Sequence, residues 1–196
     1  MEIALAQRPS LMDPDADLVR RMAAGEEDAL QALYAAYGRR LFAYALRLTA
    51  SQPLAEEVLQ DSLLGAWRSA AAYRGEARVL TWLLGIVHHQ ALNATRRRSL
   101  PLTALDKASP LADGAGQPER HLEAREQRRA LQAALDTLSP DQRAAVELVF
   151  YQGLSLAEVA QVCRCPLGTV KSRLSYARAR LRERLIQAGL QPEDVI

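Results

Sequence analysis

The chain has 196 residues, of which 49% are hydrophobic and 24% charged, and its formal net charge at pH 7 is +2. This length allows one large or two small domains with buried cores, and the composition is that of a folded protein rather than a disordered one. No apolar stretch approaches the roughly 18 residues that a membrane span needs, and the first residues do not resemble a secretion signal. We therefore expect a cytoplasmic protein without direct membrane insertion.

The sequence offers little for metal or enzyme chemistry. Cys163 and Cys165 are separated by one residue, too close for a comfortable disulfide, and the three histidines are too few and too badly placed to complete a metal site. There is no phosphate-cradling glycine loop and no nucleophile with a matching base. We expect two reduced thiols, no metal, no cofactor, no small-molecule substrate and no enzymatic activity.

The spacing of apolar residues predicts helices throughout. It follows the helical period in Leu18–Met22, Ala29–Leu48, Leu54–Ala71, Thr81–Thr95, Glu123–Leu138, Pro140–Gly153, Ser155–Val162 and Gly168–Ile186. No segment alternates with a period of two residues. Proline and glycine interrupt Leu100–Gln117, which indicates a linker. The expected fold is all-α, with two small helical domains at residues 15–99 and 123–186 joined by a flexible linker at residues 100–122.

Two helix starts are marked by capping boxes. Ser139 is followed by Pro140 and, at the third helical position, by Gln142; Ser155 is followed in the same way by Glu158. In this arrangement the serine side chain and the Gln or Glu side chain each satisfy an amide of the first turn. The two boxes predict helices that begin at Pro140 and Leu156.

Residues 154–185 have the pattern of a helix-turn-helix unit: a short capped helix, a break at Cys163–Pro166, and a longer helix. The second helix of such a unit enters the major groove of DNA. Its apolar stripe comprises Val170, Leu174, Ala177 and Leu181. The opposite side carries short polar and long cationic side chains, which suit contacts with base edges and phosphates: Lys171, Ser172 and Ser175, flanked by Tyr176 and Arg178.

The charge of this helix favours nucleic acid over two alternatives. From Arg164 to Arg184 there are seven basic residues and only one acidic residue, Glu183, whereas a solvated helix face usually mixes both signs. A helix that lies on anionic lipid usually places large residues on its apolar face, but this one has mainly Val, Leu and Ala.

An acidic patch is expected on the helix Leu54–Ala71. Its apolar side would leave four polar residues facing outward: Glu56, Glu57, Gln60 and Asp61. Acids in the first turn favour the helix dipole, but this does not explain Gln60 and Asp61. A patch that repels phosphates is better suited to a basic protein partner, although simple solubility remains an alternative.

The next segment, Tyr73–Arg98, resembles a surface for single-stranded nucleic acid. If a helix begins near Thr81, one stripe carries Trp82, Ile86, His89 and Asn93 and leads to three consecutive arginines at 96–98. Bases stack on aromatic rings or form hydrogen bonds, and arginines hold the backbone. The alternatives are that Trp82 belongs to the core and that the arginines favour the C-terminal end of the helix dipole.

Together these motifs resemble one known family, the extracytoplasmic-function (ECF) sigma factors. "AEEVLQDSLLGAW" resembles their region 2.2, "YRGEARVLTWLLGIVHHQALNATRRR" resembles regions 2.3 and 2.4, and "LSPDQRAAVELVFYQGLSLAEVAQVCRCPLGTVKSRLSYARARLRERL" is similar to region 4. The resemblance covers Asp15–Arg98 and Glu123–Leu185 in the right order and spacing.

This resemblance implies a subunit that binds core RNA polymerase at the β′ coiled coil and the β flap, recognises promoter DNA and is controlled by an anti-sigma factor. It implies core binding by Glu56, Glu57, Gln60 and Asp61; −10 DNA binding by Tyr73, Arg74, Gly75, Glu76, Trp82, His88, His89, Asn93, Arg96 and Arg97; and −35 DNA binding by Thr169, Lys171, Ser172, Arg173, Ser175, Tyr176 and Arg178. Bond formation would belong to the polymerase.

The sequence departs from the family pattern at two places. His88 and His89 replace a common Arg-Asn pair, so the −10 preference cannot be copied from relatives. Arg164 replaces a glycine of the helix-turn-helix turn, where a left-handed backbone would cost about 1 kcal/mol or more.

Two other functions remain as alternatives. An autonomous helix-turn-helix regulator would bind duplex DNA without polymerase, and would leave Gln60 and Asp61 without a role. A helical adaptor that contacts only proteins would tolerate reversal of Lys171 and Arg173 to Glu.

Overall fold

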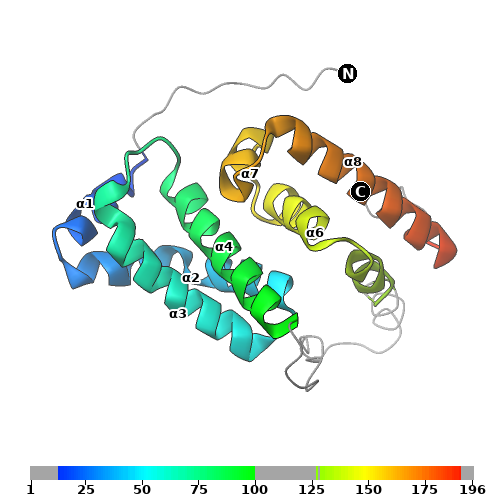
Figure 1. Cartoon of the computed structure of the whole chain (residues 1–196), viewed down its shortest axis with the longest axis horizontal. Helices are drawn as coiled ribbons and strands as arrows, with labels where there is room; N and C mark the ends of the chain where they lie inside the picture. Colours follow the sequence, from blue (N-terminus) through cyan, green and yellow to red (C-terminus); the bar gives the residue numbers. More distant parts are fainter. Residues whose placement is uncertain (1–12, 100–126, 128, 191–196) are drawn as a thin grey trace, which may run out of the picture.

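A computed structural model describes residues 13–99, 127 and 129–190 of the chain. The predicted linker at 100–122, and the first residues of the helix expected from Glu123, lie outside these ranges. Within the described residues the protein is all-α, as predicted, with one group of helices before residue 99 and a second group after residue 127 (Figure 1). None of the described helices is long and apolar enough to cross a membrane.

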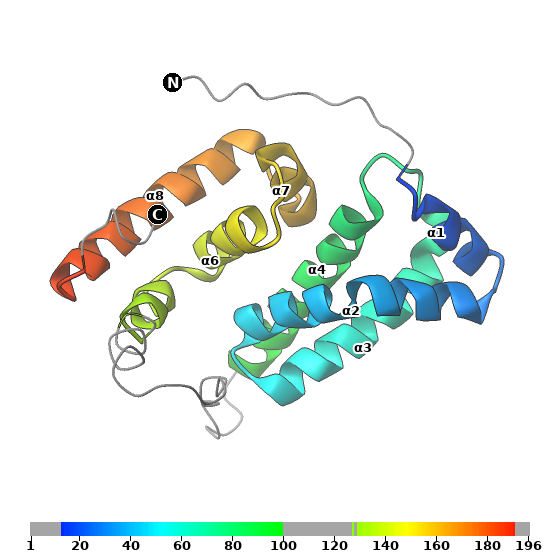
Figure 2. The ribbon, with the colours of Figure 1, turned by 180° about the vertical axis from the view of Figure 1, so that it is seen from behind.

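The first group comprises α1 (Ala16–Ala23), α2 (Glu27–Thr49), α3 (Gln52–Ser69), the short 3₁₀ helix η1 (Ala70–Ala72) and α4 (Val79–Ser99). Figure 2 shows α2 beside α3 and α4, and these three helices pack on one another. The core contains Leu33, Leu41, Tyr44, Val58 and Val87, none more than 2% exposed. The helix α4 begins two residues before the expected Thr81, because the carboxylate of Asp13 accepts a hydrogen bond of 2.7 Å from the Val79 amide.

The second group contains a helical segment at residues 129–136, then α6 (Pro140–Val146), the π-helical turn η2 (Glu147–Tyr151), α7 (Leu156–Cys163) and α8 (Leu167–Gln187). Both predicted capping boxes are confirmed, at Ser139 with Gln142 and at Ser155 with Glu158. The single helix expected over Pro140–Gly153 is wrong in its last part, where the chain changes to π-helical hydrogen bonding from Glu147.

The helix-turn-helix unit is formed by α7 and α8. Arg164 lies between them with φ 48° and ψ 47°, so the left-handed turn is kept and the arginine adopts it despite its side chain. Val170 and Ala177 of the predicted apolar stripe are fully buried, and Leu174 and Leu181 pack against the cores. The stripe was therefore predicted correctly.

The two groups of helices are in contact. In Figure 1, α6, α7 and α8 lie on the α4 side of the first group, and the closest packing between the groups is that of α7 on α4. Buried residues of the second group, among them Leu148, Leu154, Val159 and Val162, belong to the same apolar cluster as the core of α1–α4. The sequence predicted two domains but gave no indication of this contact.

Candidate interaction surfaces

The exposed face of α3 carries all four residues of the predicted acidic patch: Glu56, Glu57, Gln60 and Asp61. They lie along a ridge between two surface grooves. Glu56 and Gln60 line a groove of about 620 Å³ between α2 and α3. Glu57 and Asp61 line a second groove of about 390 Å³ between α3 and α4. The ridge therefore presents polar groups toward two different sides.

The groove between α2 and α3 has an apolar floor that the sequence analysis missed. Leu59 and Leu63 of α3 and Leu30 and Tyr34 of α2 line it, and the Tyr34 side chain is 52% exposed. Leu30 and Tyr34 are four residues apart, so they lie on one helix face. That spacing is visible in the sequence, but nothing in it shows that this face of α2 borders the acidic ridge.

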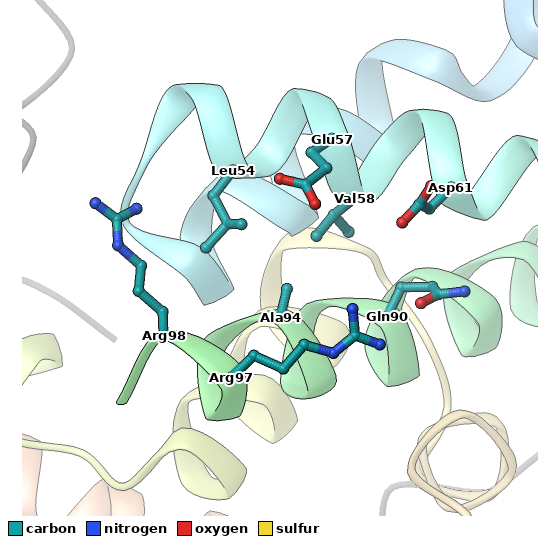
Figure 3. A pocket seen from close by; sticks show the side chains of 8 residues that line it. All are labelled: Leu54, Glu57, Val58, Asp61, Gln90, Ala94, Arg97 and Arg98. Atoms are coloured by element: carbon teal, nitrogen blue, oxygen red, sulfur yellow. The ribbon is translucent and has the colours of Figure 1, made fainter. Parts of the chain in front are cut away.

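The groove between α3 and α4 combines both signs of charge. Figure 3 shows Glu57 and Asp61 of α3 on one side of this groove and Arg97 of α4 on the other. Ala94 and Val58 lie between them. The arginine thus offsets part of the negative charge on this side of the ridge, whereas none of the described residues that line the α2–α3 groove is basic.

The loop before α4 rests on an aromatic pair. The rings of Tyr73 and Trp82 lie 5.1 Å apart at an angle of 46°, and the Tyr73 hydroxyl donates a 2.6 Å hydrogen bond to the Ala77 carbonyl. Burial raises the pKa of the Tyr73 hydroxyl, so it stays protonated as a donor. The loop residues Arg74, Gly75 and Glu76 are exposed, and Gly75 has a φ of 72° that a residue with a side chain would strain.

The two histidines of α4 differ in their surroundings. His88 is only 2% exposed, and its Nδ1 lies 2.9 Å from the Tyr44 hydroxyl. Burial lowers the pKa of His88 to about 4, so the ring is neutral at pH 7. His89 is half-buried, and its Nε2 is enclosed without a hydrogen-bond partner. His88 thus points into the core rather than toward DNA in this arrangement.

The remaining predicted residues of α4 lie toward its C-terminal end. Asn93, Arg96 and Arg97 are exposed. Trp82 is half-buried and packs against the core while it also supports Tyr73. The loop and Trp82 therefore lie at the N-terminal end of α4, and His89 lies near its middle. Arg96 and Arg97 lie at its C-terminal end.

Five of the seven residues predicted to contact duplex DNA are exposed on α8: Lys171, Ser172, Ser175, Tyr176 and Arg178. Their spacing places them on one side of the helix, opposite the buried Val170 and Ala177. The Tyr176 side chain is 68% exposed. Such a face, with cations around short hydroxyl side chains, can meet phosphates and base edges together.

The other two predicted residues of α8 have structural partners. Arg173 forms an ion pair with Asp141 of α6, and its second terminal nitrogen lies 3.5 Å from the sulfur of Cys165. Thr169 is half-buried at the start of the helix. The ion pair joins α8 to α6, so the Arg173 guanidinium already has a partner within the protein.

The cysteines of the turn are half-buried, and burial raises the pKa of the Cys163 thiol to about 12. A thiol with this pKa is a poor nucleophile at neutral pH. Within the described ranges, no group of His, Cys, Asp and Glu residues is arranged to hold a metal ion.

Comparison with known proteins identifies the family. The family description "Sigma-70 region 2" matches residues 33–100, and "Sigma-70, region 4" matches residues 128–181. The sequence is 37% identical over 168 residues to the ECF RNA polymerase sigma factor SigM of Mycobacterium tuberculosis, covering 85% of this chain and 82% of SigM. The chain is an ECF sigma factor.

Two other relatives of this chain are also sigma factors. It is 34% identical over 173 residues to SigL of Mycobacterium tuberculosis, covering 86% of this chain and 95% of SigL. It is 30% identical over 189 residues to the RNA polymerase sigma-H factor of Pseudomonas aeruginosa, covering 92% and 95%. Sigma factors are initiation factors, so the prediction that the chain is not an enzyme is confirmed by its family.

Two solved structures share the fold of this sigma factor. The sigma factor RpoE of Bartonella quintana, crystallised with the anti-sigma factor NepR, has a TM-score of 0.65 and 28% identity, covering 82% of this chain and 98% of RpoE. CnrH, solved with the cytosolic domain of CnrY, has a TM-score of 0.65 at 22% identity, covering 88% and 97%.

Proposed function

We propose that this ECF sigma factor binds core RNA polymerase in the cytoplasm, directs it to promoters and helps to open the duplex. One observation carries the proposal: a single chain combines three exposed surfaces of different chemistry, the acidic ridge of α3, the aromatic and cationic surface of α4, and the polar and cationic face of α8. A protein that only binds duplex DNA would need the last of these alone.

The α3 ridge is the proposed contact with the β′ coiled coil. Glu56, Glu57, Gln60 and Asp61 would meet a basic helical partner, and the α2–α3 groove adds an apolar anchor through Leu30, Tyr34, Leu59 and Leu63. Apolar groups at the centre with polar groups at the rim are the usual composition of a protein interface. We therefore extend the predicted contact from α3 alone to the neighbouring face of α2.

The α4 surface is the proposed contact with the opened −10 element. The loop at Tyr73–Glu76, supported by Trp82, would receive an unpaired base, while Asn93 and His89 contact neighbouring bases and Arg96 and Arg97 contact the backbone. We leave His88 out of this set, because its ring is buried against Tyr44.

The exposed face of α8 is the proposed contact with the duplex at the −35 element, through Lys171, Ser172, Ser175, Tyr176 and Arg178. Arg173 would contribute through its ion pair with Asp141 of α6, and Thr169 would flank the contact at the start of α8. Control by an anti-sigma factor is proposed from the likeness to RpoE, whose structure was solved with the anti-sigma factor NepR. The β flap is proposed as a second polymerase contact on family grounds.

The test is reconstitution with core polymerase. We expect the purified chain to form a complex with core polymerase and to support run-off transcription from a cognate promoter. Introducing positive charge at two ridge residues, Gln60→Arg with Asp61→Arg, should weaken binding to core polymerase at least tenfold, which is about 1.4 kcal/mol. The control for added positive charge is Glu27→Lys, which replaces an exposed acid of α2 outside the ridge and its grooves.

A second arm separates this function from an autonomous regulator. Lys171→Ala should lower transcription from the promoter and weaken its salt dependence, because a phosphate contact is lost, whereas Arg180→Ala, exposed on the same helix but about 180° around it from Lys171, serves as the control. Tight sequence-specific gel shifts by the chain alone, without complex formation or run-off transcription, would contradict the proposal and favour the autonomous regulator.

A further inference from the structure

The start of α4 has no capping residue of its own. The helix begins at Val79, and the carbonyl of Arg78 accepts its first hydrogen bond, which comes from the Trp82 amide at 2.9 Å. Arg78 therefore occupies the capping position, where Ser, Thr, Asp or Asn is the usual residue. A guanidinium has only donor groups, so the Arg78 side chain cannot accept a hydrogen bond from an amide of the first turn.

Asp13, which lies 66 residues earlier in the chain, supplies the missing acceptor. Its Oδ2 atom accepts a 2.7 Å hydrogen bond from the Val79 amide. Val79 is 0% exposed, so water cannot replace this partner while the helix start keeps its place. The negative charge of the carboxylate also favours the N-terminal end of the helix dipole.

The position of Asp13 is fixed by its own surroundings. Its Oδ1 atom accepts a 3.0 Å hydrogen bond from the Asp15 amide, and its carbonyl accepts a 2.9 Å hydrogen bond from the Ala16 amide. The carboxylate of Asp15 in turn accepts a hydrogen bond from the Tyr37 hydroxyl of α2. Burial and this hydrogen bond raise the pKa of Tyr37, so its hydroxyl stays a donor at neutral pH. The acceptor for α4 is therefore anchored to both α1 and α2.

The same carboxylate lies close to the aromatic support of the loop before α4. The Tyr73 ring packs on Trp82, and its hydroxyl donates to the Ala77 carbonyl. After burial, the charge of Asp13 is the second cause that raises the pKa of the Tyr73 hydroxyl. Asp13 thus acts on both ends of the loop: on Tyr73 through its charge, and on Val79 through a hydrogen bond.

The tip of this loop depends on its two ends for its conformation. Its exposed residues are Arg74, Gly75 and Glu76. The backbone of Gly75 is left-handed, and a Cβ atom built there would meet nothing within 4 Å. The tip is therefore not packed against the protein at Gly75, and a shift of the helix start would move it.

Other contacts at the start of α4 come from the second group of helices. Arg78 donates a 2.6 Å hydrogen bond to Glu158 of α7, and the Thr81 hydroxyl donates one of 3.2 Å. Both would be lost if the two groups moved apart. The contact of Asp13 with Val79 lies within the first group, so it does not depend on the position of α7.

We propose that Asp13 is a positioning residue for promoter opening: it caps α4 from the segment before α1 and so fixes the loop at residues 73–78 in the conformation that takes an unpaired base. The inference rests on the proposed function of α4. Asp13 lies outside residues 33–100, which match the description of region 2, so this role belongs to a part of the chain that the family description does not cover.

Hydrogen exchange and oligonucleotide binding test the proposal together. In free Asp13→Ala, we expect the amides of residues 73–82 to exchange about fivefold faster, the size of effect that follows the loss of one helix cap. With core polymerase, this variant should bind a single-stranded oligonucleotide carrying the −10 element of the cognate promoter about fivefold more weakly. Its affinity for core polymerase should not change. The matched control is Asp17→Ala, which removes an exposed acid of α1 that pairs with Arg20 at the surface.

Two further variants separate a cap from a merely structural role. Asp13→Asn keeps an acceptor oxygen for the Val79 amide and should retain most of the wild-type binding of the oligonucleotide. Asp13→Ala combined with Arg78→Ser gives α4 a capping residue in its own sequence, so it should recover part of the lost binding and protection. Arg78→Ser alone is the reference for this double variant, because it also removes the hydrogen bond to Glu158.

Three results would overturn the inference: unchanged exchange at residues 73–82 in Asp13→Ala, faster exchange with unchanged oligonucleotide binding, or equal losses in Asp13→Asn and Asp13→Ala. If Asp13→Ala does not fold, as judged by circular dichroism, or loses core binding as well, the double variant decides. Recovery with Arg78→Ser supports the cap, and no recovery refutes it. Failure of the wild type with core polymerase to bind the oligonucleotide would instead refute the proposed function of α4, and exchange would still show whether Asp13 holds the helix.

Discussion

His88 shows how a residue's position in a motif can differ from its role in the fold. The sequence placed His88 and His89 together in the DNA-contacting segment, but neighbouring helix residues point about 100° apart. His89 lies at the contact with the second domain, whereas His88 points to Tyr44 and hydrogen-bonds to its hydroxyl. The departure from the family's Arg-Asn pair therefore places a neutral, buried ring in the core.

This burial makes stability dependent on pH. The pKa of His88 is lowered from 6.5 to about 4, so the unfolded chain binds a proton first as the pH falls. The contribution is fully present above pH 6.5 and is lost between 6.5 and about 4. Between pH 7.5 and 5 we expect the free energy of unfolding, from urea titrations, to fall by about 2 kcal/mol through this residue.

The comparison for this prediction is His88→Gln, which keeps a hydrogen-bonding side chain but cannot titrate. This variant should lose most of the acid sensitivity and keep a smaller part, because the pKa of His89 is lowered in the same direction. An equal loss of stability in wild type and variant over this pH range would show that His88 is not buried in its neutral form.

Arg173 is a second residue whose position in a motif differs from its role in the fold. The helical pattern placed it beside Lys171 and Ser172 in the proposed DNA-contacting set. Its partner Asp141 is 32 residues earlier in the chain. No local pattern indicates such a pairing, because it depends on how α6 and α8 pack.

At the scale of the helices, the sequence predicted the helix starts at which side chains form a capping box. Ser139 and Ser155 begin helices as expected, since their capping boxes are local and involve residues only three positions apart. The end of α2 carries no such mark. Its C-terminal cap is Ala50, with φ 50° and ψ 27°, a position where glycine is the usual residue.

Ala50 therefore offers a test by a small substitution. Ala50→Gly should raise the free energy of unfolding by about 0.5–1 kcal/mol, because it removes the strain of a left-handed alanine. The control is Ala36→Gly, exposed in the interior of the same helix, which should lower it by about 1 kcal/mol. Chemical denaturation measures both, and equal signs for the two variants would contradict the left-handed cap at Ala50.

The π-helical turn at Glu147–Tyr151 was not predictable from residue spacing. Apolar periodicity continues through it, so the sequence indicated one α-helix to Gly153. The turn closes with the Gln152 amide bonded to the Glu147 carbonyl, five residues back. π-helical turns occur often at functional sites. This one contains both Glu147 and Tyr151, the two groups that meet Arg47.

At the scale of the molecule, the sequence predicted two helical domains but not their contact. The polar pairs across it are 80, 100 and 112 residues apart in the chain. On each partner separately, Arg47 and Arg78 look like ordinary charged residues of a solvated helix or loop. The packing of the second group of helices on the first brings them to Glu147 and Glu158.

The Arg47–Glu147 pair gives a test of the contact between the two groups of helices that does not touch either proposed DNA surface. Arg47→Glu places two carboxylates together at a site where Glu147 is nearly inaccessible to water, so the domains should repel. In small-angle scattering of the free chain, we expect a larger radius of gyration for Arg47→Glu than for the wild type. The double variant Arg47→Glu with Glu147→Arg restores opposite charges and should recover most of the wild-type compactness.

The exposed Arg39 of the same helix provides the matched control, because Arg39→Glu makes the same change of charge away from the contact. Recovery in the double variant is the decisive result: a change in net charge or helix stability would persist after the swap, whereas a direct pairing would not. If the swapped chain is as extended as Arg47→Glu alone, this ion pair does not hold the domains together. If it recovers and Arg39→Glu behaves as wild type, α2 and the π-helical turn meet in solution as in the structure.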